Sequence, residues 1–177
     1  MSDTGLASET SRRRRNGESE LVSIDSVHQN IHDGLFYTSR RNNAALANNA
    51  SIDVLFRVVD GAHARVSASL GGDGTFLGYS GPTTTADGTA VPRNNRNRFS
   101  TNTAASLVFH TPAVSVVGTL LVEQYVFGGS GGKAIGSDID TFLEWILSPG
   151  DYLMRLTNTS GQVQRAGLAL DWYERAV

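Results

Sequence analysis

The sequence predicts an all-β protein, an antiparallel β-sandwich or jelly roll, and three observations lead to this prediction. Apolar and polar residues alternate along several short stretches, which is typical of strands with one buried face. Turn-forming pairs such as Asp-Gly separate these stretches at short intervals. Charged residues make up only 18% of the chain, against about 25% in an average domain, and this favours a loop-rich β protein.

The chain divides into an arm and one domain. Residues 1–32 are predicted to form an extended N-terminal arm, because residues 1–20 are polar and have few large apolar groups to bury. Leu21, Ile24, His28 and Ile31 have near-helical spacing, which predicts a short helix over 21–31. Residues 33–177 are predicted to form the β-sandwich domain.

The strongest strand pattern lies on either side of Asp60-Gly61. In 51–59 and in 62–70, every second residue is apolar. We therefore expect these two strands to pair as a hairpin across a two-residue turn. One sheet would then carry one inward patch, made of Val54, Phe56, Val66 and Leu70.

Further strands are expected at 75–80, 106–111, 119–127, 141–147, 151–157 and 166–173. Asp-Gly pairs at 33–34, 73–74 and 87–88 mark turns, and Pro149-Gly150 marks a second tight turn between strands. Two long loops, 81–105 and 128–140, interrupt this pattern. Loops of this length in a compact domain usually carry function, so contacts with other subunits are expected there.

The composition excludes several classes of protein. The net charge of −2 gives no overall basic field for nucleic acid. The absence of cysteine excludes disulfide scaffolds, thiolate metal sites and cysteine nucleophiles. No apolar run approaches the roughly 18 residues of a membrane helix, so no membrane partner is expected. Residues 1–20 have no apolar stretch like that of a signal peptide, so we expect no secretion.

Three motifs resemble ligand sites and fail on spacing. The GGSGGKA stretch at 128–134 resembles a phosphate-binding loop, but Phe127 and Ala134 stand where the motif needs glycine and Ser or Thr. Asp138 and Asp140 resemble half of a calcium loop without its glycine and distal Glu. His28 and His32 could share a helix face as metal ligands, but no third ligand is near in sequence, and the alternative is a hydrogen-bonded pair.

Nothing in the sequence marks a catalytic nucleophile, because no serine lies on a strand–Ser–helix turn. We expect no enzyme activity, no cofactor, no bound metal and no small-molecule substrate.

Two basic segments form the candidate interface with capsid or neighbouring subunits. The first is Arg12, Arg13, Arg14 and Arg15, balanced by four acids within residues 1–20. It either docks on an acidic neighbour or is solvated, and nucleic-acid binding is disfavoured. The second is Arg93, Arg96, Asn97 and Arg98 within RNNRNR. Arg and Asn side chains suit a subunit interface, and hydrogen bonding within the loop is the open alternative.

Several stretches resemble the small head-decoration, or cement, proteins of tailed bacteriophages. They are IHDGLFYTSR at 31–40, NNASIDVLFRV at 48–58, TTTADGTAVPRNNRNR at 83–98, EWILSPGDYLMRLTNTSG at 144–161 and ALDWYE at 169–174. The resemblance covers about 31–174 and is most specific in ADGT to NRNR and in EWIL to NTSG. The chain departs from the family at 72–81, where Gly78 removes side-chain bulk from a strand.

The resemblance implies a structural virion protein that binds the outside of an assembled capsid and stabilises the head by bridging coat subunits. Its partners would be the major capsid protein and itself, as a homodimer or homotrimer. It would be made in the bacterial host cytoplasm and located on the capsid surface of the virion. The alternative is a tail-fibre or spike module for host surface glycans. Phe99 is the only aromatic residue in 81–105 and 128–140 has none, which favours the capsid role.

Overall fold

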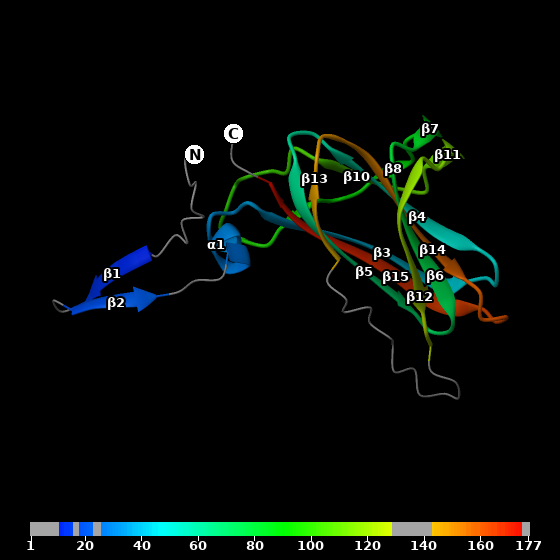
Figure 1. The fold of residues 1–177 in the computed structure, drawn as a ribbon, viewed down its shortest axis with the longest axis horizontal. Helices are drawn as coiled ribbons and strands as arrows, with labels where there is room; N and C mark the ends of the chain where they lie inside the picture. Colours follow the sequence, from blue (N-terminus) through cyan, green and yellow to red (C-terminus); the bar gives the residue numbers. More distant parts are fainter. Residues whose placement is uncertain (1–10, 16–17, 23–25, 129–142, 175–177) are drawn as a thin grey trace, which may run out of the picture.

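The computed structural model describes residues 11–15, 18–22, 26–128 and 143–174, which form almost entirely antiparallel β-structure (Figure 1). A five-stranded sheet has the order β13 (Leu143–Leu147), β5 (Ala62–Leu70), β15 (Gln164–Glu174), β3 (Phe36–Leu46) and β9 (Asn94–Asn95). A six-stranded sheet has the order β12 (Thr119–Val126), β6 (Gly74–Ser80), β14 (Gly150–Asn158), β4 (Ser51–Val58), β10 (Leu107–His110) and β8 (Thr89–Ala90). The predicted all-β fold is therefore confirmed.

Two small sheets and one helix complete the described part. β7 (Thr83–Ala86) pairs with β11 (Ala113–Val116), and β1 (Ser11–Arg15) pairs with β2 (Glu18–Val22). The helix α1 spans Ser26–His32, so the predicted helix over 21–31 begins later than expected, and Leu21 lies in β2. The 81–105 loop, expected to lack strands, contains β7, β8 and β9. Within the described residues, no helix has the length and apolarity needed to span a membrane.

The predicted hairpin across Asp60-Gly61 is wrong in its pairing, although both strands exist. β4 pairs with β10 and β14 in the six-stranded sheet, whereas β5 pairs with β13 and β15 in the five-stranded sheet. The chain therefore crosses from one sheet to the other at 59–61. The strands on either side of Pro149-Gly150 also belong to different sheets, so the turn predicted there connects β13 of one sheet with β14 of the other.

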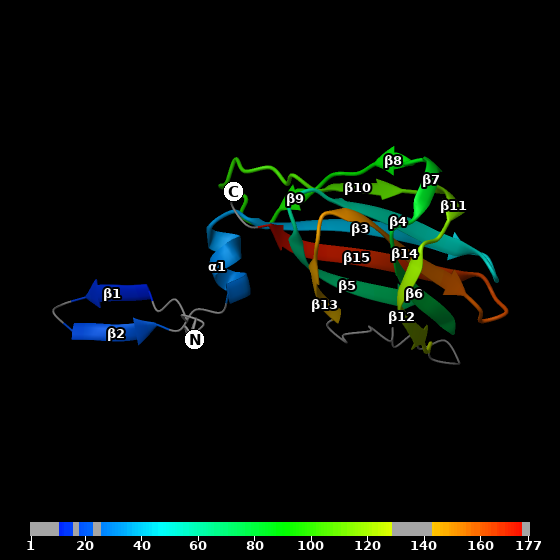
Figure 2. The same cartoon turned by 45° about the horizontal axis from the view of Figure 1, so that its top comes forward.

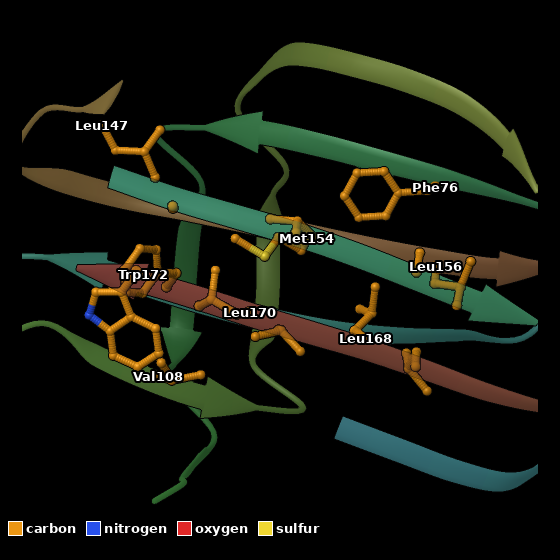
Figure 3. Packing of buried hydrophobic residues seen from close by; sticks show 14 of the residues in the cluster. Phe76, Val108, Leu147, Met154, Leu156, Leu168, Leu170 and Trp172 are labelled. Carbon is orange, nitrogen blue, oxygen red and sulfur yellow. The ribbon is translucent and has the colours of Figure 1, made fainter. Parts of the chain in front are cut away.

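The two large sheets share one hydrophobic core, as expected for a sandwich-like arrangement (Figure 2). Val54 and Phe56 enter it from β4, and Val66 and Leu70 enter it from β5, so these four residues face one another from opposite sheets. The ring of Phe56 lies 5.3 Å from that of Trp172, centroid to centroid. Figure 3 shows the side chains of β6, β10, β14 and β15 meeting between the sheets.

A row of apolar residues also crosses the outer face of the six-stranded sheet. Its members stand opposite one another on six neighbouring strands, and they are Ala90, Phe109, Leu55, Leu153, Tyr79 and Leu120. Leu55 and Leu153 are fully buried although they lie outside the main core. The ion pair between Arg155 and Asp53 lies in the next row of the sheet.

Arg57 joins this face to the turn after β7. Its guanidinium contacts Asp151 at 2.8 Å and Asp87 at 2.7 Å. The hydrogen bonds that Arg57 donates, first to Asp151 and then to Asp87, raise the pKa of Arg57 above its ordinary value. The hydrogen bond from Arg57 is the main cause that lowers the pKa of Asp87. The pair therefore ties the β7 turn to the end of β4, an inner strand of the six-stranded sheet.

Candidate interaction site

The loop at 93–102 contains the second basic segment and is held by its own side chains. Asn95 Oδ1 accepts a hydrogen bond from the amide of Asn97 at 2.9 Å, and Asn97 Oδ1 accepts one from the amide of Phe99 at 3.0 Å. Ser100 Oγ accepts one from the amide of Asn102 at 3.1 Å. Asn side chains that bond to the backbone two residues later are typical turn formers. The loop is therefore an ordered turn structure.

The same asparagines fasten the loop to the start of the domain. Their side-chain amides donate to three consecutive carbonyl oxygens, Asn97 to His32 at 2.8 Å, Asn102 to Asp33 at 3.2 Å and Asn95 to Gly34 at 2.8 Å. Gly34 has φ +70° and lies so close to the loop that an added Cβ would overlap the side chain of Ser100. The loop is thus anchored to the Asp33-Gly34 turn.

Arg93 has a structural role inside the loop. Its guanidinium donates to the carbonyl oxygens of Ala104 at 2.9 Å and Ser106 at 3.0 Å, and the residue is half-buried. Arg93 and Asn97 therefore make hydrogen bonds within the loop, which was the open alternative, and Asn97 also bonds to His32 outside it. A role of either residue in a subunit interface stays a prediction.

Arg96, Arg98 and Phe99 are different, because all three side chains are exposed. The guanidinium of Arg96 lies over the ring of Phe36, 5.3 Å from its centroid, and its amide donates to the carbonyl oxygen of Phe36. Phe99 is 100% exposed, the highest value among the large apolar residues of the described part. The loop thus presents two guanidinium groups and one aromatic ring on a fixed backbone. Figure 2 shows this loop, which contains β9, at the end of the domain where α1 lies.

The first basic segment lies in β1, and only its backbone register is described. Arg13 stands opposite Glu20 and Arg15 opposite Glu18 in the pairing with β2. This register agrees with the balance of charge noted in the sequence. The structure does not bring Arg12, Arg13, Arg14 and Arg15 into any described contact with the 93–102 loop.

The two histidines of α1 contact each other. Their Nε2 atoms lie 2.9 Å apart and their ring centroids 4.6 Å apart, so the alternative of a hydrogen-bonded pair is confirmed. Among the described residues, no group of three His, Cys, Asp or Glu side chains is placed to hold a metal ion. The GGSGGKA stretch after Gly128 and the Asp138–Asp140 pair lie outside the described residues.

Sequence reasoning missed a polar network on the outer face of the five-stranded sheet. His63 Nδ1 contacts the hydroxyl of Tyr173 and, at 3.3 Å, the carboxylate of Glu144, which also pairs with Arg65. Burial alone would raise the pKa of Glu144, but the hydrogen bonds from His63 and Arg65 lower it overall. The network links β5, β13 and β15, and only the pairing of these strands brings its members together.

Comparison with protein-family models, with curated proteins and with solved structures finds no match to this chain. The resemblance to head-decoration proteins therefore stays a prediction.

Proposed function

We propose that this protein is a structural virion protein that binds the outside of an assembled phage head and stabilises it by bridging coat subunits. One observation carries the proposal: the 93–102 loop presents Phe99 together with the exposed Arg96 and Arg98 while its backbone is fixed by hydrogen bonds. A contact that is ordered before binding avoids much of the entropy cost of association. Aromatic and Arg side chains are also the residues that most often dominate protein interfaces.

The proposal includes a jelly-roll topology. The long strands form two runs, β3 to β6 and β12 to β15, and each run alternates between the two sheets. The runs pair in reverse order, β3 with β15, β4 with β14, β5 with β13 and β6 with β12. This nested pairing supports one long hairpin wound around a common core, which is how a jelly roll is built. Jelly rolls occur in viral capsid proteins and in lectins, so the fold alone does not select a function.

The proposed partners are the major capsid protein and further copies of this chain, on the capsid surface, with no catalytic step, cofactor or small-molecule substrate. Each contact can be modest, because many copies on one closed shell add their effects. Since Arg96 and Arg98 are exposed, part of the attraction is electrostatic and weakens as salt rises. The apolar surface of Phe99 contributes an attraction that salt does not screen.

The test is co-sedimentation with undecorated heads of the phage from which the gene comes. Phe99→Ala and Arg98→Ala should each lower the affinity for heads by about tenfold or more, as expected for central interface residues. Val163→Ala is the matched control, because Val163 is 61% exposed and precedes β15 at the opposite end of that strand from Glu174. If all three variants bind like the parent chain, the loop is not the contact. Adsorption to host cells or their polysaccharide, without binding to heads, would favour the glycan-binding alternative.

The arm at residues 1–32 is proposed to reach a neighbouring subunit. The two large sheets begin at Phe36, so a chain that lacks residues 1–20 should keep its fold. It should occupy fewer sites on heads than the full chain does at the same concentration. Equal occupancy for the truncated and full chains would remove the arm from the proposal.

A further inference from the structure

β12 is the last strand of the six-stranded sheet, and β6 is its only hydrogen-bonded neighbour among the described strands (Figure 1). The far side of such a strand carries backbone N–H and C=O groups that can pair with another strand. Edge strands normally carry charges or prolines that prevent this pairing. From Thr119 to Phe127 the one charged residue is Glu123, and there is no proline.

The same segment gathers exposed apolar side chains. Nine large apolar residues of the described part are exposed, and four of them lie here: Leu120, Leu121, Tyr125 and Phe127. The rings of Tyr125 and Phe127 contact each other, with centroids 6.3 Å apart. A concentration of this kind on one edge is typical of an interaction surface.

The apolar surface continues from this edge into the gap between the sheets. A crevice beside β12 is lined mainly by apolar residues of both sheets, among them Ala64, Val66, Phe76, Leu121, Val122 and Trp145. β12 in one sheet and β13 in the other border this opening. A partner strand added to β12 would extend the six-stranded sheet and cover the mouth of the crevice.

We propose that the occupant of this edge is a second copy of the chain, paired antiparallel through β12 about a two-fold axis. Two copies of a strand that pair in this way form a closed dimer, in which symmetry repeats each contact between two different residues. With Gln124 at the axis, Val122 lies opposite Val126 of the second copy, and Glu123 lies opposite Tyr125. The six-stranded sheets of the two copies then form one continuous sheet.

The charge and the shape of β12 select this register. A register centred on Glu123 would set two carboxylates directly opposite each other, which is destabilising. Registers centred before Glu123 would run the pairing through the irregularity between Leu120 and Val122, where β12 departs from regular pairing with β6. A register centred on Tyr125 would pair fewer residues. Centring on Gln124 places each Glu123 opposite a tyrosine.

The inference does not depend on the capsid role, because the 93–102 loop and β12 share no residue. A dimer that ignores phage heads would keep the inference and reject the proposed function. A monomer that binds heads would do the reverse.

A cysteine scan tests the register, because the chain has no cysteine of its own. Directly opposite residues of antiparallel strands have Cα atoms about 4.5–5.5 Å apart, within the roughly 4.4–6.8 Å that a disulfide spans. Under mild oxidation, Gln124→Cys should form a covalent dimer. Glu123→Cys and Tyr125→Cys should each stay uncoupled alone and should couple when mixed. The control is Gln162→Cys, an exposed position outside the strands. Coupling at 162 equal to that at 124, or no coupling at 124, would overturn the inference.

Sedimentation of the full chain gives the second measurement. The parent chain and Phe99→Lys should both sediment as dimers, whereas Tyr125→Glu should sediment as a monomer with an unchanged melting temperature. The new carboxylate lies directly opposite Glu123 of the second copy and repels it, and the core is untouched because the side chain of Tyr125 is exposed. A parent chain that is monomeric at micromolar concentration, or a Tyr125→Glu variant that stays dimeric, would overturn the inference.

Discussion

The carboxylate of Glu174 accepts a hydrogen bond from the indole Nε1 of Trp172 at 3.0 Å, two residues earlier on β15. Glu174 is buried, and it also accepts hydrogen bonds from the amides of Ala105 at 2.7 Å and Ser106 at 2.9 Å. The segment that follows the 93–102 loop is therefore anchored to the end of the central strand of the five-stranded sheet. The rigidity of the proposed contact surface depends in part on this carboxylate.

Replacing Glu174 should destabilise the fold, because three donors would lose their acceptor. At about 1–3 kcal/mol for each unsatisfied group, Glu174→Ala should lower the free energy of unfolding by about 3 kcal/mol or more. Urea denaturation measures this, and the exposed Val163→Ala serves as a control with a change within about 0.5 kcal/mol. A loss of less than about 1 kcal/mol for Glu174→Ala would mean that the carboxylate does not hold this end.

Two phenylalanines should respond in opposite ways to truncation. Phe56 is fully buried against Trp172, so Phe56→Ala should cost about 3–5 kcal/mol of unfolding free energy. Phe99 is fully exposed, so Phe99→Ala should change stability by no more than about 0.5 kcal/mol while weakening the binding to heads. Similar stability losses for both variants would contradict the described burial.

The strands at 51–59 and 62–70 show which features of the fold can be predicted from the sequence. Alternation of apolar residues identifies a strand and its buried face, and Val54, Phe56, Val66 and Leu70 are indeed in the core. The pattern does not identify the partner strand, because both sheets of a sandwich face the same core with the same period of two. The Asp60-Gly61 pair favours a hairpin locally, but the pairing of each strand with β14 or β15 outweighs this preference.

The sequence indicated which residues form the candidate site, but not the contacts that hold them in place. The spacing of Arg93, Arg96 and Arg98 indicated an interface or a hydrogen-bonded loop, and the structure divides these roles among the residues. The loop that carries these arginines is fastened to residues 32–34, more than 60 positions away in the chain. No local pattern carries that information. The exposed edge of β12 could not be predicted either, because the order of strands in the sheet decides which strand lies at its edge.

The ion pair of Arg57 and Asp87 predicts a pH dependence. The pKa of Asp87 is lower in the folded protein than in the unfolded chain, because Arg57 donates hydrogen bonds to its ionised form. This contribution is present above the unfolded pKa, near pH 4, and is lost as pH falls through the folded pKa. Asp87→Asn should therefore flatten the fall in melting temperature below about pH 4 and leave the profile above pH 6 parallel to that of the parent. A profile of unchanged slope below pH 4 would contradict the assignment.

Metal removal should leave stability unchanged. The described histidine pair of α1 has no third ligand placed beside it, and the calcium-like motif at Asp138 and Asp140 lacks half of its expected ligands. Treatment with EDTA should not shift the melting temperature of the purified chain. A shift of several degrees that calcium restores would reveal a site at Asp138 and Asp140.

The central claim is that the protein stabilises an assembled head, and heating decorated heads tests it most directly. A protein that binds the assembled shell and not the separate coat subunit must stabilise the shell by mass action. Undecorated, DNA-filled heads of the parent phage would be titrated with this chain, and the release of DNA followed as the temperature rises. We predict a higher release temperature that reaches a plateau at a fixed number of copies per head, with Phe99→Ala needing a higher concentration to reach it. An unchanged release temperature at saturating protein would contradict the claim.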